Sequence, residues 1–287
     1  MSLRPRRSVL YMPASNQKAI DKARTLPCDA VVLDLEDAVA PDAKDMAREQ
    51  ALAAVRQGGF GRRELVIRTN GLDTPWGEAD LAAAATSGAD AVLVPKVNDA
   101  GDVARYDARL AHAPADLKLW AMIETGRSLF HLEDIAAASR HGRLSTFVMG
   151  TNDLVKETGA RLTTLRHALW GPLSLSVAAA KAYGLVALDG VFNGLDDPEG
   201  FETQCAQGLE FGFDGKTLIH PNQIETANRV FSPTEAEIAF ARAVIAAFAL
   251  PENADKGAIR VEGKMAERLH LAQAEKTVAI ADAIAAG

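Results

Sequence analysis

The chain has 287 residues, of which 48% are hydrophobic, so it can bury a large core within one main domain. Its formal net charge of -7 argues against nucleic acid or an anionic membrane surface as the main partner. The apolar run near the N-terminus is too short for a secretory signal, and no apolar stretch reaches membrane-spanning length. We therefore expect a soluble, cytoplasmic protein in which Cys28 and Cys205 are buried thiols.

Strand-like and helix-like segments alternate along most of the chain. Eight runs have the length and composition of β-strands, at 8–12, 30–35, 65–69, 91–95, 117–123, 144–149, 185–192 and 216–219. Helices are predicted between them, at 17–25, 42–57, 78–87, 99–112, 128–139, 164–183 and 198–211. Gly88, Gly184 and Gly212 directly follow predicted helices, as helix-ending glycines do. The alternation predicts an α/β fold with parallel strands, and eight units favour a (β/α)8 TIM barrel over an open doubly wound sheet.

The segment after the eighth strand is too long to belong to the barrel. A helix is predicted over 235–250, with apolar residues on one face and a proline directly after it. We therefore assign residues 1–250 to the barrel domain and 251–287 to a C-terminal tail. Gly257 and Gly263 are expected to be flexible joints, after which the tail forms an amphipathic helix that opens at 264–267. This helix could pack on its own barrel, on a neighbouring subunit, or close over the site as a lid.

Two carboxylates follow the fifth and sixth predicted strands. Glu124 comes directly after the run 117–123, and Asp153 follows 144–149 in a Gly-Thr-Asn-Asp sequence. The carboxyl ends of parallel strands form the ligand-binding face of a barrel, so both side chains should lie at its mouth. Such a pair can share one hard divalent cation, with Mg²⁺ expected and Mn²⁺ as the alternative. Each acid taken alone is also explained as a residue that favours a helix N-terminus.

More charged residues end the second and third predicted strands. Glu36 and Asp37 lie in an Asp-Leu-Glu-Asp sequence, and so many acids require cations or hydrogen-bond donors nearby. We expect these two residues to orient water or the metal's ligands, although they could simply be acids at a helix start. Arg68, at the end of the third strand, suits a substrate carboxylate or an enolate oxygen. A structural ion pair between Arg68 and one of the acids is an equally good explanation.

Three polar residues at the same face could contact a nucleotide-like group. Lys18, near the start of the first predicted helix, fits an anion site for phosphate, although a lone lysine there is more often solvated. His220 and Asn222 follow the eighth strand and could bond an adenine, a ribose or a phosphate. The alternative for His220 is that it locks the turn before Pro221.

Several short motifs, in the same order along the chain, resemble the citrate lyase beta subunit family. They are Arg-Ser-Val-Leu-Tyr-Met-Pro-Ala at 7–14, Asp-Leu-Glu-Asp-Ala-Val at 34–39, Arg-x-Asn-Gly at 68–71, Pro-Lys at 95–96, Ile-Glu-Thr at 123–125 and Gly-Lys-Thr-Leu-Ile-His-Pro-Asn-Gln-Ile at 215–224. The resemblance extends from Arg7 to Phe231, and the family includes malyl-CoA and citramalyl-CoA lyases among the wider 2-oxo-acid aldolases. It implies a TIM barrel, commonly a trimer or a hexamer, that binds Mg²⁺ and a CoA thioester.

The resemblance also implies roles for individual residues. Carried over by motif, Glu124 and Asp153 ligate the metal, and Glu124 is counted with Arg68 as contacting the substrate. Glu36 and Asp37 act beside the metal ligands as further catalytic residues.

On the CoA side and in the tail, the resemblance implies four more residues. Lys18, with His220 and Asn222 in the strand-eight loop, should face CoA. In many relatives a Gly-Lys-Met-Ile-Asp sequence in the tail brings an aspartate to a neighbouring active site, and this chain has Gly-Lys-Met-Ala-Glu at 263–267. We therefore expect Glu267 to move a proton in the site of an adjacent subunit, within a trimer or hexamer.

The expected reaction is reversible carbon–carbon cleavage of a carboxylated 3-hydroxyacyl-CoA, such as malyl-CoA or citramalyl-CoA, to an acyl-CoA and an α-keto acid. The metal would chelate the substrate's hydroxyl and carboxylate, and Arg68 would stabilise the enolate of the thioester. Three alternatives stay open: a thioesterase acting on the same malyl-type CoA ester, a CoA-independent 2-oxo-acid aldolase, and a beta subunit of a citrate lyase complex.

Overall fold

The structure, a computed structural model, describes residues 4–286 and divides into two units. Residues Arg6–Arg229 form the larger unit, and residues 230–286 belong, with 4–5, to the smaller one. The boundary therefore lies after Arg229, whereas the sequence analysis placed it after residue 250. The difference arises because the helix that follows the boundary packs with the C-terminal helix, which makes the two helices one unit.

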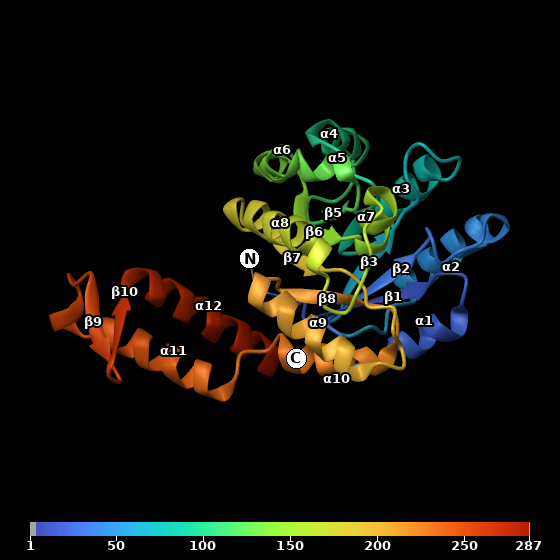
Figure 1. The fold of residues 1–287 in the computed structure, drawn as a ribbon. Helices are drawn as coiled ribbons and strands as arrows, with labels where there is room; N and C mark the ends of the chain where they lie inside the picture. Colours follow the sequence, from blue (N-terminus) through green and yellow to red (C-terminus); the bar gives the residue numbers. More distant parts are fainter. Residues whose placement is uncertain (1–3, 287) are drawn as a thin grey trace. The chain divides into compact units, whose positions relative to one another are not determined.

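In the larger unit, eight parallel strands close into a barrel, each pairing with the next along the chain and β8 with β1. The strands are β1 Ser8–Pro13, β2 Ala30–Asp34, β3 Glu64–Arg68, β4 Ala91–Val94, β5 Lys118–Ile123, β6 Leu144–Met149, β7 Val186–Asp189 and β8 Gly215–Leu218. Figure 1 shows the strands with helices around them. The TIM-barrel prediction is confirmed, and each of the eight predicted runs overlaps one strand.

Helices and short 3-10 turns connect and follow the strands. The helices are α1 Gln17–Ala23, α2 Lys44–Gln57, α3 Gly77–Ala85, α4 Ala100–Arg109, α5 Gly126–Leu129, α6 Leu132–Ala137, α7 Thr151–Thr158, α8 Trp170–Ala182, α9 Pro198–Phe211 and α10 Ile224–Val230. The 3-10 turns are η1 Pro41–Ala43, η2 Ala138–Arg140, η3 His167–Leu169 and η4 Pro221–Gln223. Helices α7 and α10 were not predicted, and the helix expected over 128–139 is split into α5 and α6. Gly88, Gly184 and Gly212 have positive φ, as glycines that end helices require.

The barrel interior explains where the site lies. Alternate strand residues point inward, and the apolar core they form includes Val32 of β2, Val66 of β3 and Met122 of β5. Continuing the alternation by two residues leads from these to Asp34, Arg68 and Glu124, all buried at the carboxyl ends of their strands. In these three strands the inward row is thus apolar within the barrel and charged at its mouth, where TIM-barrel enzymes place their active sites.

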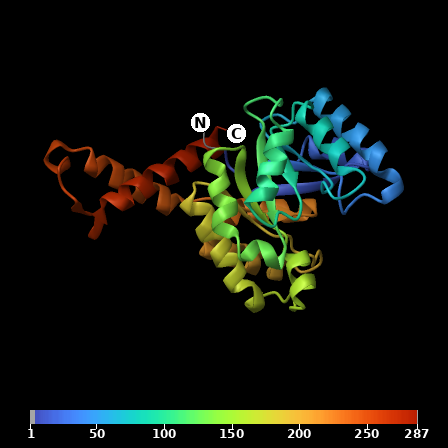
Figure 2. The same cartoon turned by 90° about the horizontal axis from the view of Figure 1, so that it is seen from above.

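The smaller unit is a pair of helices joined by a β-hairpin. Its elements are α11 Glu235–Phe248, η5 Pro251–Asn253, β9 Ala258–Val261, β10 Lys264–Glu267 and α12 Arg268–Ala285. Figures 1 and 2 show α11 and α12 running side by side, and Val244, Phe248 and Ala274 are buried in their common core. The expected helix at 264–267 is a strand instead, because Glu262 and Gly263 both have positive φ and turn the chain into an antiparallel hairpin.

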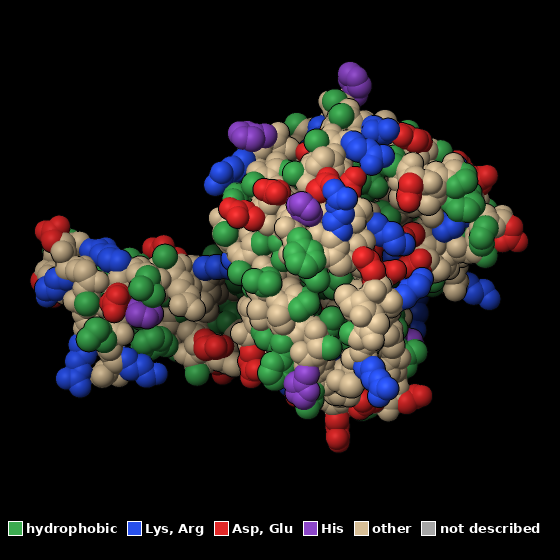
Figure 3. Space-filling model, turned by 45° about the horizontal axis from the view of Figure 1, so that its top comes forward, with side chains coloured by type: hydrophobic (Ala, Val, Ile, Leu, Met, Phe, Trp, Pro, Cys, Tyr) green, Lys and Arg blue, Asp and Glu red, His purple; other side chains and the backbone are tan. Residues whose placement is uncertain are grey.

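The surface charges and the two cysteines agree with what the composition indicates. Acidic and basic side chains are interspersed over the face drawn in Figure 3. Between residues 4 and 286, no helix combines the length and the hydropathy needed to cross a membrane. Both cysteines are free and buried, as expected; burial raises the pKa of Cys28 to about 11 and that of Cys205 to about 12. Both therefore remain protonated thiols at neutral pH.

Candidate active site

A cavity of about 320 Å³ lies at the carboxyl ends of the barrel strands. Its lining residues come from the ends of most of the strands and from the loops and helices that follow them: Tyr11, Pro13, Asp34, Asp37, Ala38, Arg68, Met122, Glu124, Met149, Gly150, Thr151, Asn152, Asp153, Val191, Asn193, Thr217 and Ile219. A volume near the lower end of the range for ligand pockets suits a small polar acyl group. Of the predicted residues, Asp37, Arg68, Glu124 and Asp153 are brought together here.

Arg68 is held by acidic residues of the neighbouring strand. Its Nε and Nη2 donate to the two carboxylate oxygens of Asp34, at 2.7 and 2.6 Å, and its Nη1 lies 2.6 Å from Oε2 of Glu36. Burial alone would lower the pKa of Arg68, but the ion pair with Asp34 outweighs it and raises the pKa. The ion pair expected of Arg68 is thus present, whereas its contact with substrate stays a prediction, for which its place in the cavity lining leaves room.

Tyr11 supports the same guanidinium from the end of β1. The Arg68 guanidinium carbon lies 4.8 Å from the centre of the Tyr11 ring, a cation–π contact. The Tyr11 hydroxyl is buried and has no hydrogen-bond partner among the described residues, although the side chain lines the cavity. Burial raises the pKa of Tyr11 well above its usual value, so the phenol stays neutral and can donate a hydrogen bond.

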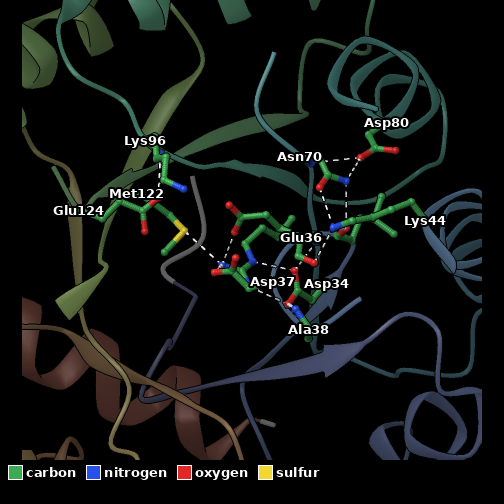
Figure 4. Close-up of polar contacts among 12 residues, drawn as sticks. Asp34, Glu36, Asp37, Ala38, Lys44, Asn70, Asp80, Lys96, Met122 and Glu124 are labelled. Atoms are coloured by element: carbon green, nitrogen blue, oxygen red, sulfur yellow. Dashed lines mark hydrogen bonds and ion pairs between the residues drawn. The ribbon is translucent and has the colours of Figure 1, made fainter. Parts of the chain in front are cut away.

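Glu124 is fixed at the end of β5 by its neighbours on both sides. On one side the backbone N–H of Lys96 donates to its Oε1 at 2.8 Å, as Figure 4 shows. Lys96 has a φ of 51°, a left-handed conformation that is uncommon for a residue with a side chain and that recurs at functional sites. On the other side, a Cβ on Gly150 would lie 2.4 Å from Oε2 of Glu124, so only glycine lets the carboxylate approach the start of α7.

The acids that line the cavity, together with Glu36 beside it, repel each other and lie close to the same cationic side chains. Burial, followed by the charge of Glu36, raises the pKa of Glu124 to about 8, and Asp153 adds to the rise. Burial also raises the pKa of Glu36 to about 7, with Arg68 opposing the shift. Burial alone would lower the pKa of Lys96, but the acids, with Glu36 first, outweigh it and raise the pKa. The site therefore has an excess of carboxylate over cationic side chains.

The donor set fits a hard divalent cation. Mg²⁺ accepts one or two protein carboxylates and fills its other positions with water and substrate oxygens. Glu124 and Asp153 both line the cavity, and a cation there would relieve the repulsion that raises the pKa of Glu124. Among residues 4–286, no group of three or more His, Cys, Asp or Glu side chains is arranged to hold an ion. The role of Glu124 and Asp153 as metal ligands therefore stays a prediction.

The residues expected to face CoA lie at the ends of β1 and β8, but the cavity lining does not include them. Lys18 is exposed in the first turn of α1. Nδ1 of His220 accepts a hydrogen bond from the backbone N–H of Asn222 at 3.2 Å, so His220 does lock the turn at Pro221. The Asn222 side chain donates to the carbonyl of Leu195 at 3.2 Å. Their contact with CoA stays a prediction.

Two further predicted residues, Asp37 and Glu267, are exposed to solvent. The Asp37 side chain is 67% exposed, and one of its oxygens lies 3.7 Å from Nη1 of Arg68. Glu267 is exposed at the end of β10, where its backbone N–H donates to Nδ1 of His270 at 2.9 Å. Glu267 thus belongs to the smaller unit, and its action in a neighbouring site stays a prediction.

Sequence reasoning missed several residues of the site. Asp34 was not assigned a role, yet it pairs with Arg68 through both oxygens; the signal was available, because both residues end neighbouring strands. Tyr11 carried no signal beyond its place at the end of the first strand. Lys44, which contacts the backbone of Glu36, lies in a segment predicted only as helix.

A family model described as HpcH/HpaI aldolase/citrate lyase matches residues 7–221. The chain belongs to this family. The resemblance found in the motifs is thereby confirmed: a citrate lyase subunit beta of Leuconostoc mesenteroides subsp. cremoris is 32% identical over 287 residues, which cover 98% of this chain and 94% of the relative. A crystal structure of protein CitE from Mycobacterium tuberculosis, in complex with magnesium, acetoacetate and coenzyme A, has a TM-score of 0.77 at 28% identity, covering 98% of this chain and 100% of that one.

Other relatives correct the expected reaction of this member of the HpcH/HpaI aldolase/citrate lyase family. A curated (3S)-malyl-CoA thioesterase of Cereibacter sphaeroides is 49% identical over 282 residues, covering 98% of this chain and 96% of the relative. An L-malyl-CoA/beta-methylmalyl-CoA lyase of Cereibacter sphaeroides is only 32% identical over 310 residues, covering 99% and 96%. The prediction of a carbon–carbon lyase is therefore wrong, and the thioesterase alternative fits better. Both reactions start from the same class of CoA thioester, so the strand-end motifs do not reveal which bond breaks.

Proposed function

We propose that this protein hydrolyses the thioester of a (3S)-malyl-CoA-type substrate, releasing CoA and a hydroxy dicarboxylic acid. The observation that carries the proposal is the 49% identity, over 98% of the chain, to a (3S)-malyl-CoA thioesterase. The site supports it, because the buried Arg68 lines the cavity and pairs with Glu36, a carboxylate beside the lining whose pKa is raised to about 7, the value expected of a general base at neutral pH.

Glu124 and Asp153 are proposed to hold one Mg²⁺, or Mn²⁺ in its place, at the cavity wall. A bound divalent ion would supply positive charge that binds and orients the oxygens of the hydroxyacyl group. Glu124 keeps one oxygen on the backbone N–H of Lys96, which fixes the direction in which the other oxygen points.

The remaining residues are proposed to position and activate water. Glu36 accepts a proton from a water molecule, which attacks the thioester carbonyl carbon. Arg68 stabilises the negative charge that develops on the carbonyl oxygen, and Tyr11 keeps the guanidinium in place. The C–S bond then breaks, the carbonyl carbon becomes a carboxylic acid, and the sulfur leaves as the CoA thiolate and takes up the proton that Glu36 accepted, which regenerates the base. Asp37, at the edge of the cavity, is proposed to orient the water.

The CoA portion must extend beyond a cavity of about 320 Å³. We propose that it runs along the rim where Lys18, His220 and Asn222 lie, since these follow the adjacent strands β1 and β8. We further propose a trimer or hexamer in which Glu267 of one subunit assists the site of another.

The function is tested by following both possible products. The purified protein is incubated with (3S)-malyl-CoA and Mg²⁺, and free thiol and keto acid are measured in the same sample. We expect free thiol and malate to appear in equal amounts without keto acid. Keto acid without free thiol would overturn the proposal, as would no turnover of any malyl-type CoA ester.

Metal affinity should depend on pH because Glu124 must be ionised to act as a ligand. Its pKa of about 8 means that the metal-free site holds a proton at neutral pH, which binding must release. We expect the affinity for Mg²⁺ to weaken by up to about tenfold for each pH unit below 8. Calorimetry in two buffers with different ionisation enthalpies measures the released proton directly. Equal affinity at pH 6 and pH 8, with no proton release, would contradict a role for Glu124 as ligand.

Replacing Arg68 by lysine should be far from conservative. An ammonium group cannot donate to both oxygens of Asp34 and reach Glu36 as well, whereas the planar guanidinium does so in this structure. We expect Arg68→Lys to lower kcat/KM by about 10²-fold and the free energy of unfolding by about 1–3 kcal/mol, because a buried acceptor loses its donor. Steady-state kinetics and urea unfolding test both. A kcat close to wild type would make Arg68 peripheral to the chemistry.

A further inference from the structure

A buried lysine outside the cavity holds the segment that carries Glu36. Lys44 is the first residue of α2 and is 6% exposed. Its Nζ donates to the carbonyl of Leu35 at 2.8 Å, the carbonyl of Glu36 at 2.7 Å and Oδ1 of Asn70 at 2.8 Å, so all three protons are used. Figure 4 shows this ammonium group between Asn70 and the Glu36 segment.

The partners of Lys44 are themselves fixed. The side-chain nitrogen of Asn70 donates to the carbonyl of Leu35 at 2.9 Å and to Oδ2 of Asp80 at 2.6 Å. Asp80 is 1% exposed, and its other oxygen accepts from Nε of Arg48 at 2.7 Å. The chain of contacts thus joins α2, the end of β3 and α3 to the two carbonyls directly after β2.

The two acids beside Arg68 depend on Lys44 to different degrees. Asp34 accepts from two nitrogens of Arg68 and from the backbone N–H groups of Glu36 and Ala38 at 2.9 and 3.3 Å, so its position is fixed by four bonds. The Glu36 carboxylate is held by one 2.6 Å ion pair with Nη1 of Arg68. Its placement therefore relies on its backbone, whose carbonyl accepts from Lys44 and whose N–H donates to Asp34.

We infer that Lys44 is a positioning residue of the hydrolytic reaction: by binding the carbonyls of Leu35 and Glu36, it keeps the Glu36 carboxylate on Arg68 and within reach of the attacking water. Displacing a catalytic group by about 1 Å is enough to cost up to 10²-fold in rate. Lys44 itself is not proposed to bind substrate, because its three protons are all donated to protein oxygens. The inference rests on the role proposed for Glu36.

The first test does not need activity. Hydrogen exchange is compared between Lys44→Met, the wild type and Lys22→Met, a matched control because Lys22 is exposed on α1. We expect exchange of the peptide covering residues 34–40 to become at least about tenfold faster in Lys44→Met, with residues 47–57 and the control unchanged. Uniform loosening of α2 would show a merely structural lysine, and unchanged exchange at 34–40 would overturn the proposal outright.

The second test is a double-mutant cycle with Glu36→Gln, followed by release of thiol from (3S)-malyl-CoA. Lys44→Met alone should lower kcat by about 10- to 100-fold and change KM by less than about threefold. In the Glu36→Gln background, the same substitution should lower kcat by less than about threefold, because the group that Lys44 positions is gone. Equal losses in both backgrounds would show that Lys44 does not act through Glu36.

A second substitution of Lys44 is available in case the Lys44→Met protein folds poorly. If Lys44→Met cannot be purified, Lys44→Gln, which keeps a donor for one carbonyl, is carried through the same measurements. Failure of both variants to fold would make Lys44 a core residue and end the proposal. If the wild type does not hydrolyse the ester, the proposed function fails, and hydrogen exchange still decides whether Lys44 holds the 34–40 segment.

Discussion

Asp153→Asn is expected to abolish Mg²⁺ binding and to lower kcat by at least about 10²-fold while the protein stays folded. Asp153 lines the cavity and is the single acidic residue in the first turn of α7. Asparagine has nearly the same shape and can still occupy a helix N-terminus, but it removes the negative charge that a cation needs. Calorimetry measures the loss of metal binding, and circular dichroism verifies the fold.

Glu157→Gln is the matched control, since it removes the charge of an exposed acid one helical turn further along α7. It should leave metal affinity and kcat within about twofold of wild type. Full activity of the wild type in excess chelator would contradict the metal proposal, and so would an Asp153→Asn variant that binds Mg²⁺ normally.

Glu36→Gln should lower kcat by about 10²- to 10⁴-fold, the range associated with loss of a general base. The amide keeps the size of the side chain but cannot accept a proton from water. Because Glu36 works as a base only when ionised, wild-type activity should fall as the pH drops through its pKa, which is about 7 in the metal-free site. A bound divalent ion would move this limb to lower pH, since positive charge favours the carboxylate. The pH profile of thiol release tests whether activity falls, as expected, when the pH is lowered.

Two comparison variants sharpen the result. Glu49→Gln changes an exposed acid of α2 in the same way and should leave kcat and the pH profile unchanged. Asp37→Asn should cost less than Glu36→Gln, because the Asp37 carboxylate is 67% exposed and is proposed only to orient water. A larger loss for Asp37→Asn would assign the base to Asp37 and contradict the role of Glu36.

The barrel and much of the candidate site could be predicted from the sequence. Strands of four to six residues carry a strong signal because both faces are buried, which makes them short apolar runs between helices. Charged residues at the end of such a run, such as Arg68, or directly after it, such as Glu124, must lie at the barrel mouth whatever the details of packing. Which side chains of a strand point into the barrel follows from the alternation of side chains along the strand, and this alternation does not depend on the neighbouring strands.

Contacts between segments distant in the sequence could not be predicted in this way. Lys44 follows the Glu36 carbonyl by only eight residues, but its third partner, Asn70, is 26 residues away and reaches it only because β2 and β3 pair. The hairpin over 258–267 was missed because Glu262 adopts a positive φ, which its residue type does not favour.

The sequence by itself determined the fold class, the family and the set of charged groups at the barrel mouth, because these depend on local pattern and motif. The tertiary structure decided which of those groups interact: Asp34 with Arg68 through a bidentate ion pair, Glu36 with one guanidinium nitrogen, and Glu124 with the backbone of Lys96. It also decided the boundary at Arg229, through the packing of α11 on α12. The physical reason is that burial and distance set ion pairing and pKa, and both arise only when strands far apart in the chain lie side by side.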